Sequence, residues 1–489
     1  MLGLRLMAKK GLDAYVFVMD SRYTKLAKNS GIMLVGNLSS KLISFLLLPV
    51  YTQYLSTEAY GESDMINVYA SIFLAIITCC VADAMFVYPK SENDIGKKRF
   101  FTSGIVFSII TFSIFAFFLW FLDSFSISLK GGVLLLDKWW IYFSALTMFI
   151  QQYCQQFTLS LEKTLNYALA GILLTFLMAI LAIVLLPKYG LSGYLLSIVI
   201  ANIGAALFSF FASKSYRYLS LKFIDKDYTK KLLSYGIPLI PNSLMWWLVN
   251  GINRPIMEVQ LGLSAIGIYA VANRFPSVLS MIFQVIGKGM SISVIDEFKK
   301  DDFNFFYNRI LKVLTLSVIV LGIFLCFFSK LIIKVFTDAE YFPSWQYMPL
   351  LTLAVIFQCM GGFVGNVFMA EKKSKYFFYS SFWAALTSLF FTFVLINYLG
   401  LFGVCLAIVL SFLVLFVTRI YYAWKHIDAF NVKYYVFIFT LYIIFVLIIT
   451  FDVSIYLQLL AIIVFLLMSY FLNKDDVSSV FKMVKSKKK

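Results

Sequence analysis

The chain has 489 residues, of which 61% are hydrophobic and 14% are charged. Soluble domains average about 25% charged and about 45–50% apolar residues, so this composition excludes an ordinary soluble protein. The net charge of +17 raises nucleic acid as a partner. The basic residues, however, sit in short segments between apolar runs, which is typical of the positive-inside bias of membrane proteins. We therefore expect no nucleic-acid partner.

A helix that crosses a bilayer core of about 30 Å needs about 20 mostly apolar residues, and such stretches recur along nearly the whole chain. The pattern predicts an all-α polytopic membrane protein with about fourteen transmembrane helices. The spans centre on 30–54, 62–87, 100–122, 139–160, 167–187, 191–213, 231–252, 264–287, 310–330, 346–369, 376–396, 400–422, 433–451 and 453–472. The loops between them are too short for a soluble catalytic domain.

The distribution of basic residues predicts the orientation. With the N-terminus inside, the cytoplasmic segments collect 34 Lys and Arg and the opposite side collects 6, while Lys41 and Arg274 fall inside spans. This asymmetry predicts an even number of spans with both termini in the cytoplasm. Residues 1–29 are then expected to form a cytoplasmic leader, and residues 474–489 a basic cytoplasmic tail.

Similar residues recur at a nearly constant spacing, which indicates an internal repeat. The offset drifts from 206 to 210 residues across six spans. The matched pairs include Pro49 and Pro255, Asn67 and Asn273, and Gly190 and Gly400. We therefore expect two six-helix lobes, 30–213 and 231–425, joined by a linker at 214–230 and followed by two extra helices at 426–473. An even number of helices per repeat predicts a two-fold axis along the membrane normal.

The stretch at 235–277 is apolar enough to enter the bilayer twice, yet it is interrupted by polar residues and by Pro238 and Pro241. Such residues are tolerated at membrane depth only where they face protein or a water-filled cavity. We therefore expect this hairpin to line a cavity together with the first two spans, its repeat equivalents. The proline pair is either a fixed kink or a bending point in a gating helix.

Lys41 and Arg274 lie near the middle of their predicted spans. A cation at that depth costs at least about 2.5–3.5 kcal/mol on insertion scales, so something must offset it. One reading is a structural salt bridge with Asp64, Asp83 or Glu258, although these carboxylates lie closer to the ends of the predicted spans. The other is a cationic cavity that receives an anion. The three carboxylates are also the candidates for ion coupling.

The predicted cavity set combines cations and amides at helical spacing. Its members are Lys41, Arg274, Asn37, Asn67, Asn242, Asn250, Asn273 and Arg254. Arg254 falls near the external mouth, where it either lines the cavity or anchors the helix at the interface. The glutamines of the fourth span, which include Gln151 and Gln155, are expected to form interhelical hydrogen bonds.

Metal and cofactor chemistry has no support in the sequence. The six cysteines all lie inside apolar runs without metal-ligand spacing, and the single histidine, His426, sits among loop residues. We expect neither a metal site nor a cofactor, and no His-based catalysis.

Two stretches resemble bacterial polysaccharide-biosynthesis flippases of the Wzx type. They are NSGIMLVGNLSSKLISFLLLPVYTQYLSTEAYG near the start and YGIPLIPNSLMWWLVNGINRPIMEVQLGLSAIGIYAVANRFPSVL in the middle. These flippases belong to the superfamily that also holds the multidrug-and-toxin extruders and the lipid II flippases. The resemblance covers residues 25 to about 425. It implies a fourteen-helix fold around a central cavity, and movement of an undecaprenyl-diphosphate-linked oligosaccharide between the membrane leaflets.

These residues bear on three possible functions. A flippase for a lipid-linked oligosaccharide suits a cationic, amide-rich cavity and would work in the bacterial cytoplasmic membrane beside lipids and other polysaccharide assembly proteins. A drug or metabolite antiporter of the same fold typically uses a carboxylate in the first or seventh span, and neither span has one here. A membrane polymerase or ligase would need a substantial external loop. We therefore expect a flippase rather than an enzyme.

Overall fold

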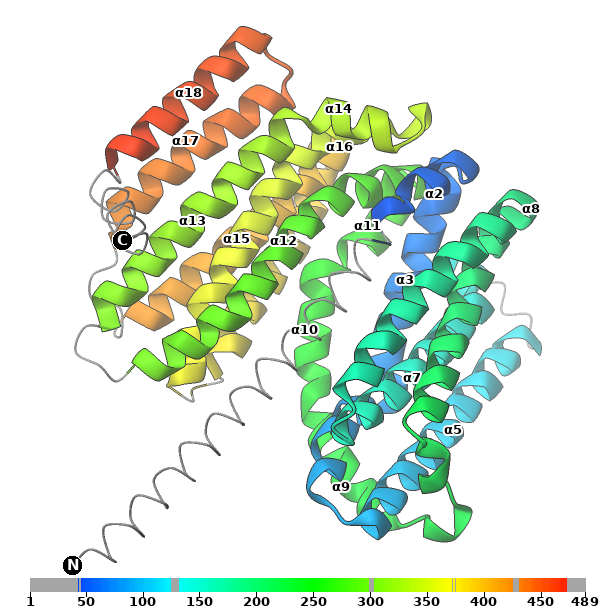
Figure 1. Ribbon diagram of the computed structural model, residues 1–489. Coiled ribbons are helices and arrows are strands. Elements are labelled where there is room, and N and C mark those ends of the chain that lie inside the picture. The colour runs from blue at the N-terminus through cyan, green and yellow to red at the C-terminus, as the bar shows by residue number, and fades with distance from the viewer. Residues whose placement is uncertain are drawn as a thin grey trace, which may run out of the picture. The chain divides into compact units, whose positions relative to one another are not determined.

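The computed structural model describes residues 43, 45–124, 132–298, 303–371, 373, 375–424 and 431–472. Within these ranges the regular structure is helical and contains no strand (Figure 1). Eight of the helices are long and apolar enough to cross a membrane, or nine if one bent pair counts as a single span. The predicted all-α polytopic membrane fold is confirmed.

The chain divides into two compact units. The first unit holds residues up to 47 and residues 69–240, and the second holds residues 48–68 and 241–489. The boundary cuts α3 (Thr57–Thr78) after Val68, so the first half of this helix packs within the second unit. The sequence assigned residues 48–68 to the first six-helix lobe, and that division into lobes stays a prediction.

The first unit is built from long apolar helices joined by short turns. They are α4 (Val81–Val87), α5 (Asp94–Ser124), α7 (Lys138–Ser160), α8 (Thr164–Ala212) and α9 (Lys226–Gly236), with short helices η1 (Pro89–Ser91), α6 (Val133–Leu136), η2 (Ser215–Tyr218), η3 (Leu221–Phe223) and η4 (Ile237–Leu239). Gln155 donates a hydrogen bond to the Tyr167 carbonyl across α7 and α8 at 2.9 Å. The interhelical role predicted for the glutamines therefore holds at this residue.

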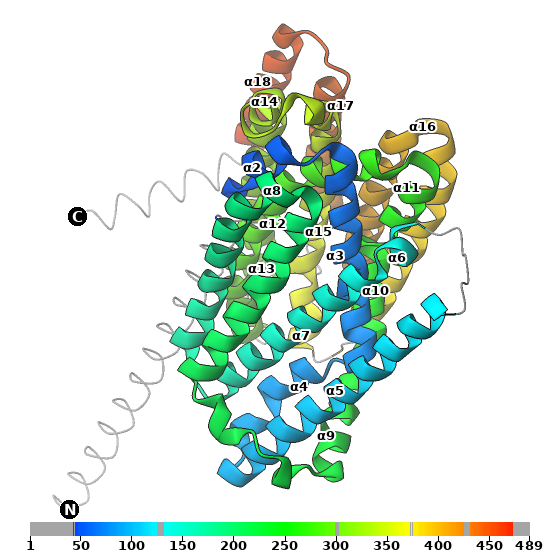
Figure 2. The same ribbon diagram turned by 90° about the vertical axis from the view of Figure 1, so that its right-hand side faces the viewer.

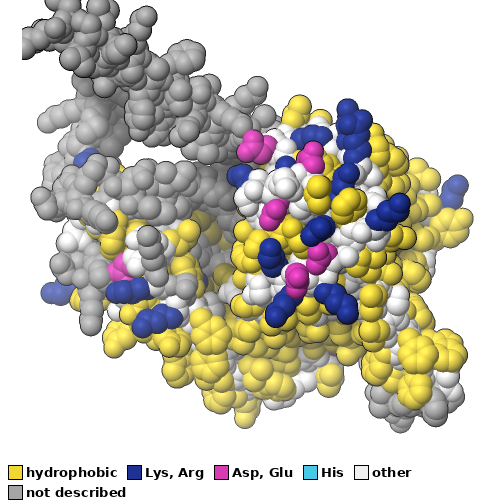
Figure 3. Space-filling model, turned by 90° about the horizontal axis from the view of Figure 1, so that it is seen from below, with side chains coloured by type: hydrophobic (Ala, Val, Ile, Leu, Met, Phe, Trp, Pro, Cys, Tyr) yellow, Lys and Arg dark blue, Asp and Glu magenta, His cyan; other side chains and the backbone are white. Residues whose placement is uncertain are grey.

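One end of the first unit carries many Lys and Arg side chains (Figure 3). The segments 90–99 and 214–231 bring them there, and Arg99 forms an ion pair with Asp225 at 3.1 Å. Lys98 lies over the Phe223 ring, 5.5 Å from its centre. This is the end that the charge count assigns to the cytoplasm.

The second unit packs around α15 (Ser344–Ala370), in which most side chains are buried. Its other elements are α2 (Leu48–Tyr54), the first half of α3, α10 (Ile240–Asn250), α11 (Asn253–Leu261), α12 (Leu263–Glu297), α13 (Phe303–Phe327), α14 (Ser329–Phe336), η5 (Ala339–Tyr341), α16 (Lys375–Ala423), α17 (Val432–Thr450) and α18 (Ile455–Leu472). The helices α12 and α16 pack against α15 most extensively (Figure 1).

Both 49-residue helices, α8 and α16, are helical hairpins rather than single spans. Each turns at a glycine with nearly the same backbone conformation: φ is 54° and ψ is −131° at Gly190, and φ is 55° and ψ is −131° at Gly400. A positive φ favours glycine because it has no Cβ. Asn166 reaches the Ala212 carbonyl at 3.0 Å, which shows that the arms of α8 run antiparallel. The predicted repeat therefore recurs in the backbone geometry.

A second repeat-related pair brings two helices of the second unit into close backbone contact. A Cβ added to Gly61 on α3 would overlap the Leu263 carbonyl oxygen of α12, and one added to Gly267 would overlap the Thr57 carbonyl oxygen. Gly61 and Gly267 are 206 residues apart, as are Thr57 and Leu263, so the contact is reciprocal. Small residues allow this approach between membrane helices.

Two details of the sequence prediction are corrected. The predicted span 62–87 is broken, because α3 ends at Thr78 and the chain bends by 65° into α4 (Figure 2). Cys79 and Cys80 form the break with φ of 49° and 53°. Arg419, counted with the cytoplasmic loops, is buried in α16 and donates to the Gly361 carbonyl at 2.9 Å. Removing Arg419 from the 34 Lys and Arg counted as cytoplasmic still leaves a large asymmetry against the 6 on the other side.

We predict that Gly61→Ala and Gly267→Ala each lower the unfolding temperature of the purified protein. The added methyl group overlaps a backbone carbonyl that cannot move aside, and overpacking of this kind costs about 1–3 kcal/mol. Gly362→Ala in α15 is the matched control, because its added Cβ meets nothing within 4 Å. Equal stability of the Gly61→Ala and Gly362→Ala proteins would show that the helices do not meet at Gly61.

Candidate functional site

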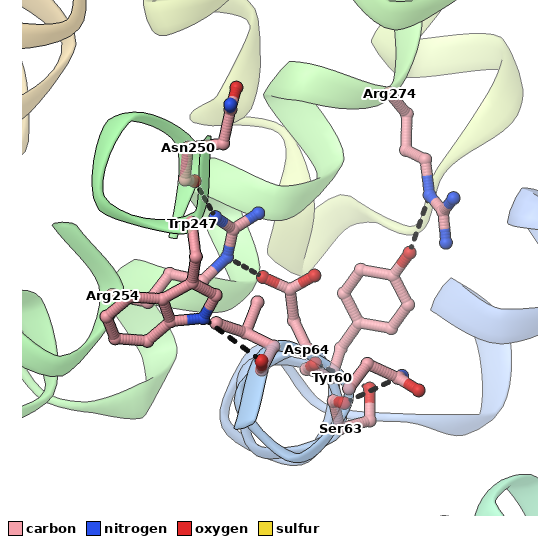
Figure 4. Close-up of polar contacts among 9 residues, drawn as sticks. Tyr60, Ser63, Asp64, Trp247, Asn250, Arg254 and Arg274 are labelled. Atoms are coloured by element: carbon pink, nitrogen blue, oxygen red, sulfur yellow. Dashed lines mark hydrogen bonds and ion pairs between the residues drawn. The ribbon is translucent and has the colours of Figure 1, made fainter. Parts of the chain in front are cut away.

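Polar and charged side chains of α3, α10, α11 and α12 converge within the second unit (Figure 4). The chain breaks at Gly251 and Ile252 between α10 and α11, so the polar hairpin predicted at 235–277 is not one straight helix. The break places Arg254 in the first turn of α11, while Arg274 projects from the middle of α12. Asp64 and Tyr60 on α3 lie between the two arginines.

Arg254 is the most constrained charge of the cluster. Its Nε donates to Asp64 Oδ2, and its Nη1 donates to the Asn250 carbonyl at 2.6 Å. The guanidinium also lies 5.2 Å from the centre of the Tyr269 ring, within cation–π range. The side chains of Arg254 and Asp64 are 11% and 25% exposed. Arg254 is therefore a largely buried cation paired with Asp64, and its role, either lining the cavity or anchoring the helix at the interface, stays a prediction.

Arg274 is held by a neutral partner. Its Nε donates to the Tyr60 hydroxyl at 3.2 Å, and Tyr60 is itself 2% exposed. The positive charge of Arg274 also acts on Arg254 by repulsion. Asp64 thus neutralises Arg254 directly, whereas the salt bridges considered for Lys41 and Arg274 stay predictions. Tyr60 and Asp64, four residues apart on α3, thus each contact one arginine of the cluster.

A short segment at 338–341 fixes the start of α3 and hence the positions of Tyr60 and Asp64. Glu340 Oε1 accepts hydrogen bonds from Thr57 N at 3.0 Å and from Thr57 Oγ1 at 2.7 Å. The Tyr341 hydroxyl donates to the Leu55 and Ser56 carbonyls, each at 2.8 Å. The Glu340 carboxylate satisfies a backbone N–H that a helix start leaves without an intrahelical partner. We call residues 338–341 the capping segment.

The predicted asparagines differ in their surroundings. Asn67 Nδ2 donates to the Ser63 carbonyl and Asn250 Nδ2 to the Trp246 carbonyl, both at 2.9 Å and within their own helices. Asn242 is exposed on α10, and Asn273 is half-buried beside Arg274. Lys41 and Asn37 lie outside the described residues. The structure therefore brings Arg254, Asn250, Asp64 and Arg274 together.

The remaining predicted residues are spread along the chain. Pro238 lies in η4 and Pro241 in the first turn of α10, so the pair coincides with a short 3-10 turn that joins α9 to α10. Their gating role stays a prediction. Glu258 is half-buried on α11 in the second unit. Asp83 is half-buried in the first turn of α4, in the first unit, and its carboxylate has no hydrogen bond or ion pair to any described residue.

Sequence reasoning missed three residues of the cluster or its support. Tyr60 and Tyr269 contact the arginines, but the chain has 30 tyrosines and nothing in its pattern singled these out. Asn253 is the third of these residues. It is 0% exposed, and its Oδ1 accepts from Thr392 Oγ1 at 2.7 Å and Ser388 Oγ at 3.2 Å. This contact secures α11 to α16 beside Arg254.

The cluster is suited to hold a multivalent anion. A guanidinium has five N–H donors in a planar fork that matches phosphate and carboxylate oxygens. Arg254 donates from Nε to Asp64 and from Nη1 to the Asn250 carbonyl. Removal from water strengthens such contacts because the local dielectric is low. Charged residues within apolar helices are rare and often functional, so this cluster is the candidate site.

Two protein-family models match parts of this chain. The family model described as "Polysaccharide biosynthesis protein" matches residues 26–298, and the MatE model matches residues 228–394. The chain is 24% identical over 286 residues to the Lsg locus putative protein 1 of Haemophilus influenzae, over 54% of this chain and 65% of that relative. The alignment thus spans less than two thirds of the relative's own length.

Solved structures share the fold. The inward closed conformation of the lipid II flippase MurJ superposes with a TM-score of 0.67 and 17% identity, over 92% of this chain and 100% of that chain. The inward-facing conformation of a multidrug resistance MATE family transporter superposes with a TM-score of 0.62 and 14% identity, over 80% and 95%.

The fold and the cluster define a multi-pass helical membrane protein of the transporter and flippase type. Since the first family model covers more than half of its length, the chain belongs to the polysaccharide biosynthesis protein family.

We predict that Asp64→Asn lowers the unfolding temperature markedly, because it leaves the Arg254 guanidinium buried without its counter-charge. Removing one partner of a buried pair costs up to about 3–5 kcal/mol, and less here because Asp64 is one quarter exposed. The exchange Asp64→Arg with Arg254→Asp should recover much of the loss.

The control for this prediction is an exposed pair in the same unit. Lys330 and Asp452 are 2.6 Å apart, with side chains 46% and 49% exposed. Asp452→Asn should change stability little, since exposed pairs contribute at most about 1 kcal/mol. If Asp64→Asn and Asp452→Asn behave alike in thermal unfolding, the Arg254 pair is not a structural contact.

Proposed function

We propose that the protein is a flippase that moves an undecaprenyl-diphosphate-linked oligosaccharide across the bacterial cytoplasmic membrane for surface polysaccharide synthesis. The observation that carries the proposal is the placement of two arginines in one polar cluster within apolar helices, where Arg254 pairs with Asp64 and Arg274 donates to the Tyr60 hydroxyl. A diphosphate supplies the further negative charge that such a cluster attracts. The family match and the fold shared with MurJ support the proposal.

The mechanism follows from the chemistry of the two parts of the substrate. The diphosphate would be held by the guanidinium groups, and the amides of Asn67, Asn242, Asn250 and Asn273 would face sugar hydroxyls. The lipid tail would stay in the bilayer. Rocking of the two repeats would expose the head group first to one side and then to the other. This step makes and breaks no covalent bond, so the protein would not act as an enzyme.

The proposal includes location and partners. Both termini would lie in the cytoplasm, in keeping with the charge asymmetry of the loops. Membrane lipids would surround the helices, and other polysaccharide assembly proteins would supply and use the lipid-linked substrate. Lys41, Asn37, Pro238 and Pro241 belong to this proposal as cavity and gating residues.

An ion-coupled drug or metabolite antiporter is the second candidate function. The MatE match to residues 228–394 and the multidrug transporter that shares the fold favour it. The two arginines argue the other way, because guanidinium groups bind an anionic substrate better than a cationic drug. The two functions differ in the charge of the substrate that the cluster would accept. It would be negative for the flippase and positive for an exporter of cationic drugs.

We predict that Arg274→Ala, alone or with Lys41→Ala, stops export of surface polysaccharide while the protein remains folded and in the membrane. The measurement is complementation of a deletion strain, followed by analysis of surface polymer and of lipid-linked intermediates. Intact lipid-linked oligosaccharide should accumulate on the inner leaflet. Lys188→Ala, at an exposed cation outside the cluster, is the control.

Full export by the Lys41→Ala/Arg274→Ala double variant would overturn the assignment of these cations. Normal polymer combined with increased sensitivity to cationic drugs would favour the antiporter instead. Loss of polymer with repeat units already exposed on the outer leaflet would assign the protein to a step after flipping.

Ion coupling, if the transport uses it, should depend on Asp83 more than on Asp64 or Glu258. Asp64 is occupied by Arg254, whereas the Asp83 carboxylate contacts no described ionisable partner and can take up a proton without breaking a salt bridge. We predict that Asp83→Asn removes the dependence of polymer export on the proton gradient. Unchanged dependence in Asp83→Asn, with loss in Glu258→Gln, would transfer the role to Glu258.

A further inference from the structure

A polar pocket of about 320 Å³ opens in the second unit where α13 and α17 begin. It lies on helices separate from the arginine cluster, and α17 belongs to the predicted extra pair outside the repeats. Its walls combine amides, cations and aromatic rings: Asn304, Phe305, Asn308, Arg309, Lys312, Asn431, Tyr434 and Tyr435. The positive-inside count places this end of both helices at the cytoplasmic surface.

The electrostatics of the pocket favour an anion. Arg309 and Lys312 are three residues apart on α13, so they share one face of the helix, and Lys312 Nζ lies 4.9 Å from the centre of the Tyr434 ring. The N-terminus of α17 adds the positive end of a helix dipole. There Asn431 caps the helix by accepting a hydrogen bond from Tyr434 N at 3.1 Å.

The amides of the pocket favour a ligand with hydroxyl groups. Asn308 Nδ2 donates to the Asn304 carbonyl at 2.8 Å. The Asn304 and Asn308 Oδ1 atoms are both buried, and neither accepts a hydrogen bond from a described residue. A buried acceptor without a donor is costly, so a bound hydroxyl would stabilise it. The pocket therefore offers cations to a phosphate and carbonyl oxygens to a polyol.

An apolar groove of about 440 Å³ adjoins this pocket at Tyr435, which lines both. The groove runs between α16 and α17, with Phe357 of α15 contributing to its wall. Its lining is almost wholly hydrocarbon and includes Tyr421 and Val436, which are 73% and 59% exposed. In a membrane-spanning protein, such exposed apolar side chains face the acyl chains of lipids.

We propose that the pocket and the groove together bind one resident phospholipid whose head group carries a phosphate and free hydroxyls, such as phosphatidylglycerol. The phosphate contacts Arg309 and Lys312, and the hydroxyls donate to the side-chain Oδ1 atoms of Asn304 and Asn308. An acyl chain lies in the groove. The pocket volume is at the small end of ligand sites and suits one polyol rather than an oligosaccharide. This lipid would join α17 to α13 in the cytoplasmic leaflet.

The test is native mass spectrometry of the full-length purified protein titrated with defined lipids. Phosphatidylglycerol should bind more tightly than phosphatidylcholine, which has no free hydroxyl and no net charge, and than phosphatidic acid, which lacks the polyol. Arg309→Gln should weaken phosphatidylglycerol binding about 5-fold, and Arg309→Gln/Lys312→Gln about 30-fold, from about 1 kcal/mol per cation at a membrane surface. Lys188→Gln/Lys334→Gln, at exposed cations elsewhere, is the matched control.

A second variant tests the groove without changing any charge. Val436→Trp places a bulky side chain into it, so binding of long-chain phosphatidylglycerol should weaken while binding of a short-chain form should not. Because Val436 is exposed, this variant is expected to fold.

Equal binding of phosphatidylcholine and phosphatidylglycerol, or unchanged affinity in the Arg309→Gln/Lys312→Gln variant, would overturn the proposal. One-for-one displacement of phosphatidylglycerol by undecaprenyl diphosphate would also overturn it, because the site would then belong to a transported lipid. None of these results decides the flippase proposal, which has its own test because it depends on Arg254 and Arg274.

Discussion

A guanidinium within membrane-spanning helices requires a counter-charge, and the contact between Arg254 and Asp64 supplies it. Much of the second unit positions this pair. The break at Gly251 and Ile252 sets Arg254 at the start of α11, and the buried Asn253 holds that start against α16 through Thr392 and Ser388. Without these contacts the cation would be exposed to hydrocarbon at a cost of at least about 2.5–3.5 kcal/mol.

Asp64 depends in turn on how α3 is held. The capping segment satisfies the first N–H of the helix through Glu340, and Tyr341 secures the two residues before it. The paired glycines let α3 approach α12 closely enough for Tyr60 to meet Arg274. Side chains separated by 190 and 214 residues in the sequence thus form one polar cluster.

The sequence was informative about the fold because apolar length and glycine turns are local properties. The hairpin turns at Gly190 and Gly400 followed from the repeat and lie where predicted. The polar stretch at 235–277 also carries the arginine cluster, as expected. Depth estimates were less reliable, because the break after α10 and the bend after α3 change how far a residue lies along the membrane normal.

Partners could not be predicted from one sequence. Asp64 and Arg254 are 190 residues apart, and Thr57 and Glu340 are 283 apart, so no periodicity connects them. The sequence left two roles open for Arg254, cavity lining and interfacial anchoring, because it does not show that Asp64 lies beside it. Tyr60 and Tyr269 have polar neighbours at helical spacing, Asp64 and Asn273, but the sequence does not show that either ring meets an arginine. The cluster therefore emerges only once the helices are packed.

The most direct test of the account is flipping by the purified protein in proteoliposomes. A fluorescent undecaprenyl-diphosphate oligosaccharide is placed in the inner leaflet, and its arrival in the outer leaflet is followed with a membrane-impermeant quencher. The account predicts transfer by the wild-type protein, little transfer by Arg274→Ala, and no transfer of an uncharged analogue that lacks the diphosphate. Equal transfer of the charged lipid and its uncharged analogue would contradict the claim that the arginine cluster recognises the diphosphate.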